Sequence, residues 1–166
     1  MKKKILLFVM LAFLLVGCSM DNTPTARVED LFSKYLRLDA DIKTGIDAVL
    51  DEQNLTDTHK ERYRKLLEKQ YKNLSYEIKD ETIDGDKATV LVEIKVTDYK
   101  NAISDLTFDS SIYSKESFDE TKLDRLEQTQ DKVTYTLELP LSKDTEGKWK
   151  LDALTNEQIK KIQGMY

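Results

Sequence analysis

Few residues in this sequence have the types and spacing that catalysis requires. The chain has one cysteine, Cys18, and one histidine, His59. A single histidine rules out a His-rich metal site and leaves one candidate base for a nucleophilic triad. His59 comes four residues before Tyr63, at the start of an apolar helical stripe. We therefore expect a packed or half-exposed histidine rather than a catalytic one.

Acidic residues suggest two cation sites, and each has a simpler explanation. Asp39, Asp41 and Gly45 follow part of the pattern of a calcium loop. The pattern fails because Lys43 takes the third ligand position, the glycine comes one residue late and no bidentate glutamate follows. A hairpin turn accounts for Asp84-Gly85-Asp86. We predict neither a metal nor a cofactor.

Four aromatic residues at helical or strand spacing are candidates for the lining of a ligand cavity: Tyr35, Tyr76, Tyr135 and Trp149. Aromatic rings provide apolar area together with a polar tip, which suits a binding pocket. Aromatic residues at the same periods also fit an ordinary hydrophobic core, and the sequence leaves both interpretations open.

The N-terminal segment has the layout of a secretory signal. Three lysines, Lys2 to Lys4, precede twelve consecutive apolar residues from Ile5 to Val16, and Gly17 and Cys18 follow. Twelve helical residues span roughly 18 Å, which is too short for a hydrocarbon core of about 30 Å. We predict a cleaved signal over residues 1–17 rather than a permanent transmembrane helix.

The end of this segment, Leu15-Val16-Gly17-Cys18, resembles the lipobox of bacterial lipoproteins. The resemblance implies cleavage before Cys18, a diacylglyceryl group on its thiol and acylation of the new N-terminus. Two or three acyl chains anchor a protein stably to a membrane. The alternative is an ordinary signal peptide with an accidental cysteine, but an unpaired cysteine in an exported protein then lacks an explanation.

Composition after cleavage indicates one acidic domain. The leader holds three of the 26 Lys and Arg residues and none of the 31 Asp and Glu residues, so the mature formal charge is 23 − 31 = −8. An acidic chain without a basic, aromatic-rich cluster is an unlikely match for phosphate backbones, and we expect no nucleic-acid partner. Residues 18–24 form a predicted lipidated tether and residues 25–166 a single domain.

Three amphipathic helices are predicted before any strand. Thr23 or Thr25 caps the first, with Pro24 in its first turn, and Thr56 or Thr58 begins the third. Their apolar stripes are Val28, Leu31, Phe32, Tyr35 and Leu36; Ile42, Ile46, Val49 and Leu50; and Tyr63, Leu66, Leu67 and Tyr71.

Apolar and polar residues then alternate from Leu74 to Ile78 and from Ala88 to Val96. This alternation indicates two strands joined by a hairpin turn at Asp84-Gly85. A later strand is indicated by the alternating residues from Val133 to Leu139. Pro140 lacks a backbone N–H donor, so this strand should end there or lie at an edge of the sheet. Thr155 and Gln158 form a capping box for a C-terminal helix. Residues 98–131 indicate a helical turn or two near each end, and the serine-rich stretch between these turns fits either a loop or an edge strand. The inward-facing residues are Leu74, Tyr76 and Ile78; Ala88, Val90, Val92, Ile94 and Val96; Val133, Tyr135, Leu137 and Leu139; and Trp149 and Leu151.

The predicted fold class is α+β, with N-terminal helices packed on a curved antiparallel sheet and a C-terminal helix. This order of elements, with the strand at Trp149, resembles the nuclear transport factor two-like or cystatin-like superfamily. Many exported lipoproteins of unassigned function are similar to it. Enzymes of that superfamily carry an acid or histidine inside the cone. The inward faces here have neither, and Glu93, Lys95, Glu138, Lys150 and Asp152 fall on the opposite face.

We therefore expect a non-enzymatic domain, lipid-anchored through Cys18 to the outer face of the cell membrane, that binds a protein or cell-envelope partner. A small-molecule module with an apolar cone-shaped cavity is the second hypothesis, and an isomerase- or dehydratase-like enzyme is the third. The sequence does not identify the partner, the oligomeric state or the sorting between inner and outer membranes.

Overall fold

The protein is described from a computed structural model, which describes residues 22–166. The predicted signal, the lipobox and Cys18 lie outside the described residues. The elements, in chain order, are α1 (Pro24–Arg37), α2 (Ala40–Asp51), α3 (Asp57–Lys72), β1 (Ser75–Asp84), β2 (Lys87–Thr97), α4 (Tyr99–Ala102), α5 (Lys115–Gln128), β3 (Lys132–Lys143), β4 (Trp149–Leu151) and α6 (Asn156–Gln163).

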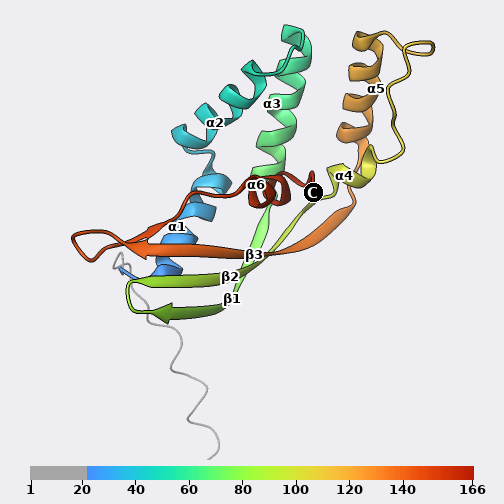
Figure 1. Ribbon diagram of the computed structural model, residues 1–166. Coiled ribbons are helices and arrows are strands. Elements are labelled where there is room, and N and C mark those ends of the chain that lie inside the picture. Colours follow the sequence, from blue (N-terminus) through green and yellow to red (C-terminus); the bar gives the residue numbers. More distant parts are fainter. Residues whose placement is uncertain (1–21) are drawn as a thin grey trace, which may run out of the picture.

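The predicted α+β class is confirmed. The strands form one antiparallel sheet in the order β1-β2-β3-β4. α2, α3 and α5 rise from one side of the curved sheet, and α6 packs between them and the strands (Figure 1). The N-terminal end of α1 and the loop before α5 lie at opposite ends of the molecule (Figure 1).

The helix starts follow from capping side chains. Of the alternatives predicted, Thr23 and Thr56 are the caps, since their hydroxyl oxygens accept the backbone N–H groups of Ala26 and His59. Both bonds of the predicted capping box form at α6, where Thr155 and Gln158 each accept a backbone N–H from the other. Each cap satisfies donors that the first helical turn leaves without a partner.

Alternation along β2 and β3 places the predicted apolar face in the core. Residues of these strands that are at most 6% exposed are Ala88, Val90, Val92, Ile94, Val96, Leu137, Leu139 and Leu141. Val28 and Phe32 of α1 cover this face and are fully buried. Glu138, Lys95 and Lys150 lie exposed on the other face, as the period of two requires.

Of the two alternatives predicted at Pro140, the end of the strand is wrong, because β3 continues to Lys143. The Pro140 carbonyl accepts a hydrogen bond from the backbone N–H of Asp152, so its backbone polar groups face away from β2. Short β4 pairs only with residues 141–143, which leaves this side of β3 an edge up to the proline. The missing N–H therefore costs the β2–β3 ladder nothing.

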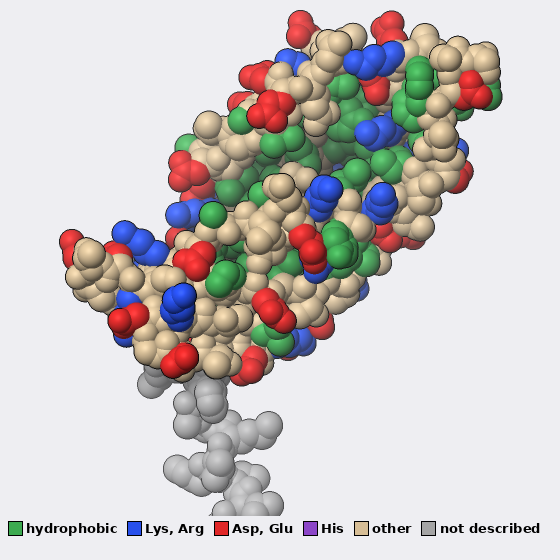
Figure 2. Space-filling view, viewed as in Figure 1, with side chains coloured by type: hydrophobic (Ala, Val, Ile, Leu, Met, Phe, Trp, Pro, Cys, Tyr) green, Lys and Arg blue, Asp and Glu red, His purple; other side chains and the backbone are tan. Residues whose placement is uncertain are grey.

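Residues 98–131 form an arm beside α3. A second hydrophobic cluster joins Leu66 of α3 to Tyr99 of α4 and to Leu123 and Leu126 of α5. Figure 2 shows hydrophobic side chains gathered in the hollow between α3 and α5. The serine-rich stretch between α4 and α5, for which the sequence left loop and edge strand open, is a loop.

Candidate functional site

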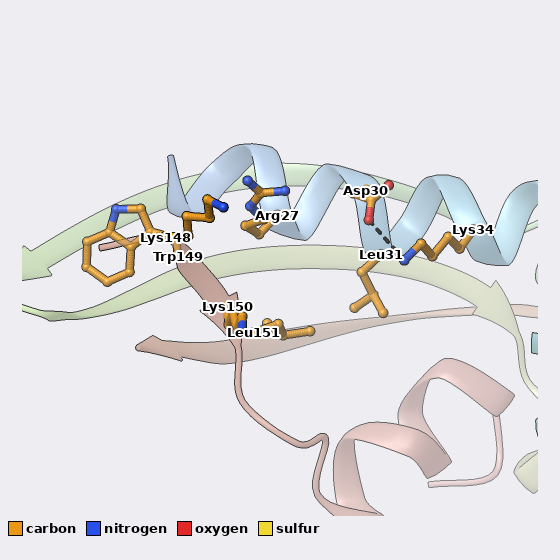
Figure 3. Close-up of a pocket in the computed structure, with 8 residues that line it drawn as sticks. All are labelled: Arg27, Asp30, Leu31, Lys34, Lys148, Trp149, Lys150 and Leu151. Carbon is orange, nitrogen blue, oxygen red and sulfur yellow. Dashed lines mark ion pairs between the residues drawn. The ribbon is translucent and has the colours of Figure 1, made fainter. Parts of the chain in front are cut away.

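The described residues contain a groove of about 420 Å³ between α1 and the β4 edge of the sheet (Figure 3). Four of its residues are one helical face of α1, where spacings of three and four bring side chains together. The other four belong to β4 and the residue before it. The lining is Arg27, Asp30, Leu31 and Lys34, with Lys148, Trp149, Lys150 and Leu151.

The groove combines an apolar floor with a mainly basic rim. Leu31, Trp149 and Leu151 supply the apolar surface, and Trp149 is 5% exposed. Arg27 and three lysines surround it, against a single carboxylate, that of Asp30. Such a rim favours an anionic group.

Ion pairs already hold the three lysines of the rim. Lys34 lies 3.2 Å from Asp30, Lys148 lies 2.6 Å from Glu146 and Lys150 lies 3.0 Å from Asp144. The backbone N–H of Lys148, followed by the Lys150 ammonium, lowers the pKa of Asp144 to about 2. The turn before β4 is therefore held by a carboxylate that stays charged above strongly acidic pH.

Arg27 differs from the other three cations. Residues 22–166 supply it with no carboxylate partner, and its buried Nε has no hydrogen-bond partner among them. An unpaired buried donor is unfavourable by about 1–3 kcal/mol, more when charged. An anion bound in the groove would relieve this deficit.

The groove is poorly equipped for acid–base catalysis. Its eight residues include no His, Ser, Thr or Cys, and the Asp30 carboxylate is engaged by Lys34. General acid–base chemistry needs a titratable group free to exchange a proton with a substrate. The arrangement instead suits binding of a negatively charged group.

The four aromatic candidates do not converge on one cavity. Tyr35 packs edge-on against Tyr71, with ring centroids 4.9 Å apart, and burial raises the Tyr35 pKa. Tyr76 stacks on Phe32 at 4.6 Å. Tyr135 donates its hydroxyl to the Tyr166 carbonyl. Trp149 alone of the four lines the groove.

His59 is packed, as expected, and its partner was not foreseen. Its Nε2 lies 2.9 Å from an Oε2 of Glu120 in α5. Arg62, one turn along α3, holds Glu120, Asp124 and Glu127 at 2.6–2.7 Å. These contacts fasten α5 to α3, which is a structural role.

Neither acidic segment forms a cation site. Asp39 pairs with Arg37 just before α2, and Gly45 lies inside that helix. Asp86 lies in the β1–β2 turn beside Lys143. Within residues 22–166, no three His, Cys, Asp or Glu side chains are grouped so as to hold a metal ion.

Sequence reasoning missed the groove as a site. Arg27 and Lys34 are seven residues apart on one face of α1, and Lys148 and Lys150 alternate around Trp149. Both signals are visible in the sequence, but only the packing of α1 against β4 brings them together.

Helices of residues 22–166 include none long and apolar enough to cross a membrane.

No protein-family model, curated protein or solved structure matches the chain.

Proposed function

We propose that the protein is an exported lipoprotein whose single domain is a non-enzymatic binding module on the outer face of a cell membrane. The observation that carries this proposal is Leu15-Val16-Gly17-Cys18 directly after a basic and apolar leader. Asn22, the first residue that the structure describes, comes four positions later, and its side chain donates to the Gly147 carbonyl and accepts from the Trp149 N–H. A short tether between lipid and domain is consistent with both.

Binding has more support than catalysis. The core face of the sheet is filled by aliphatic side chains and by Phe32 of α1. A substrate cone of the isomerase or dehydratase type needs an acid or histidine in an open interior. An apolar small-molecule cavity has less support for the same reason, since Tyr35 and Tyr76 pack into the core cluster.

A protein partner is supported by an aromatic cluster formed by the loop before α5 and by the start of that helix, which carries Phe118. Phe108 and Tyr113 each pack edge-on against Phe118, while Phe108 and the neighbouring Ile112 remain 49% and 71% exposed. Exposed apolar groups gathered in this way are typical of contact surfaces. The cluster lies at the opposite end of the molecule from the start of α1 (Figure 1).

The anchor is tested by Cys18→Ser, with Ser19→Ala as the matched control. We expect the control to partition into detergent and to yield an N-terminal peptide that begins at Cys18 and carries the mass of the lipid. The serine variant should lose both properties while its circular dichroism spectrum stays that of a folded domain. Unchanged detergent partitioning of Cys18→Ser contradicts the proposal.

Partner binding is tested in intact cells with a photo-crosslinking residue at position 108 and, as the control, at Ile83, which is equally exposed on β1. We expect a discrete adduct at position 108 that disappears in the Cys18→Ser background. Adducts of equal yield at both positions, or none at 108, argue against the aromatic cluster as the contact surface.

A further inference from the structure

We propose that the groove between α1 and β4 binds the phosphates of anionic lipid headgroups in the anchoring membrane, and so fixes the orientation of the domain. This inference rests on the lipid anchor proposed above. It adds a second membrane contact, made by the folded domain itself, and specifies which end of the domain faces the bilayer.

The tether places the groove next to the membrane surface. Asn22 is held against the β3–β4 hairpin by two hydrogen bonds, of 3.0 Å to the Gly147 carbonyl and 2.9 Å from the Trp149 N–H. Asn22 comes four positions after Cys18, and a fully extended chain over that interval spans about 14 Å. The residue that supports the groove floor therefore cannot lie far from the lipidated cysteine.

The formal charge of the groove favours it over the rest of the chain as the part that contacts an anionic membrane. The eight lining residues carry four cations and one carboxylate, a sum of +3. The mature chain carries 23 − 31 = −8, so its remaining residues sum to −11. An anionic bilayer attracts Lys and Arg near its surface by about 1 kcal/mol each and repels acidic faces within a Debye length of about 8 Å.

Arg27 is the centre of the proposed contact. Glu146 and Asp144 offset Lys148 and Lys150, but residues 22–166 leave Arg27 without a carboxylate and its buried Nε without an acceptor. A phosphate has several acceptor oxygens and matches the planar guanidinium. It can also share the neighbouring lysines, whose side chains are 39–69% exposed in their present ion pairs. Ion pairs of exposed lysines contribute little to stability, so an added phosphate can compete for these ammonium groups.

The floor of the groove suits the polar–apolar boundary of a headgroup layer. In Figure 3 Leu31 lies between Arg27 and Lys34, Leu151 lies beside Lys150, and the Trp149 ring lies at one end of the groove beyond Lys148. Tryptophan is enriched at membrane interfaces because its ring is apolar and its N–H polar. With this edge toward the bilayer, the exposed loop before α5 points away from it (Figure 1).

Trp149 is the only tryptophan of the chain, so its fluorescence reports on the groove alone. The mature lipidated protein is reconstituted into vesicles of phosphatidylcholine with or without phosphatidylglycerol, each containing a nitroxide-headgroup lipid. We expect strong quenching of Trp149 in the anionic vesicles and weak quenching in the neutral ones. About 1 M salt, at which the Debye length falls to about 3 Å, should remove the difference.

The double variant Arg27→Gln, Lys150→Gln tests the residues. Lys65→Gln, Lys100→Gln is the matched control, since both lysines are exposed and lie on α3 and α4. Each variant removes two positive charges from the same chain. We expect the ratio of headgroup-facing to other orientations, taken from the fluorescence lifetimes, to fall roughly five- to thirtyfold in the groove variant only.

A second reporter tests orientation. In Trp149→Phe, Phe108→Trp, the single tryptophan moves to the loop before α5, and we expect little quenching in either vesicle. Equal quenching at both positions, equal quenching of Trp149 in neutral and anionic vesicles, or the same loss in both charge variants overturns the proposal. A response of Trp149 to inorganic phosphate at constant ionic strength, without vesicle dependence, assigns the groove to a soluble anion and also overturns it.

Vesicle flotation separates the two proposals. A protein that fails to float with any vesicle lacks the lipid anchor, and the proposed function then fails. A protein that floats with both vesicle types, with Trp149 unquenched in both, keeps its anchor and refutes only the orientation by the groove.

Discussion

Replacing Gln70 by leucine should be among the most destabilising single changes in this protein. Gln70 in α3 is fully buried, and its side-chain amide forms two hydrogen bonds with the backbone of Thr97 in β2. Its Nε2 donates to the Thr97 carbonyl at 3.0 Å, and its Oε1 accepts from the Thr97 N–H at 2.9 Å. Gly164, at the end of α6, packs on the same junction, since a Cβ there would lie 1.9 Å from the Thr97 oxygen.

The expected loss follows from the two backbone groups that leucine leaves unpaired. A buried donor or acceptor without a partner is unfavourable by about 1–3 kcal/mol, so the free energy of unfolding should fall by about 2–6 kcal/mol. That is a large share of the roughly 5–15 kcal/mol typical of a domain. Urea unfolding at pH 7, followed by Trp149 fluorescence and circular dichroism, measures the change.

Gln128→Leu, in an exposed position of α5, is the matched control and should change stability by at most about 0.5 kcal/mol. A loss below about 1 kcal/mol for Gln70→Leu, at an unchanged denaturant slope, refutes the junction as a major source of stability.

Gln70→Glu gives the junction a pH signature. The carboxyl group that this change introduces, when protonated, can still donate a hydrogen bond to the Thr97 carbonyl. The ionised carboxylate has no proton to donate to that oxygen, and at this buried position it is not solvated by water. Burial raises the pKa of such a group above its usual value of about 4.3. The variant should therefore be closest to the parent protein below about pH 4 and lose stability as the pH rises through the folded-state pKa. A variant that gains stability over that rise contradicts the reasoning.

Three further changes test other parts of the structure. The Asp144 pKa is lowered from 3.8 to about 2, so its stabilising effect is present above pH 3.8 and disappears as the pH falls toward 2. Asp144→Asn should accordingly lose less thermal stability between pH 4 and 2 than the parent, and equal losses count against the assigned contacts. Arg62→Leu removes a cation from three half-exposed carboxylates and should cost about 1–2 kcal/mol, with faster amide hydrogen exchange in residues 115–128. Unchanged hydrogen exchange in α5 would show that its apolar contacts hold the helix against α3 without Arg62. Phe32→Ala, at a fully buried position, should cost about 3–5 kcal/mol in urea unfolding, and a loss under 2 kcal/mol would mean that α1 does not seal the core.

Local chemistry made much of the fold readable from the sequence. Helix starts depend on one hydroxyl and the next three backbone groups, which is why Thr23, Thr56 and Thr155 could be identified as caps or candidate caps. A strand's buried face depends only on a period of two, so the inward side of β2 was predictable. The predicted lipidation of Cys18 likewise depends on the residues directly before it in the sequence.

Tertiary structure decided what depends on residues far apart in the chain. His59 and Glu120 are 61 positions apart, and the segment that holds Glu120 has no strong period of its own. Pro140 could remain within a strand because its backbone faces away from β2, on the side where the pairing of β3 with β4 ends at Leu141. Arg27 and Lys150 share a groove only because α1 packs beside β4. Spacing within a segment sets which face a side chain occupies, whereas the partner that it meets there is set by how the elements pack.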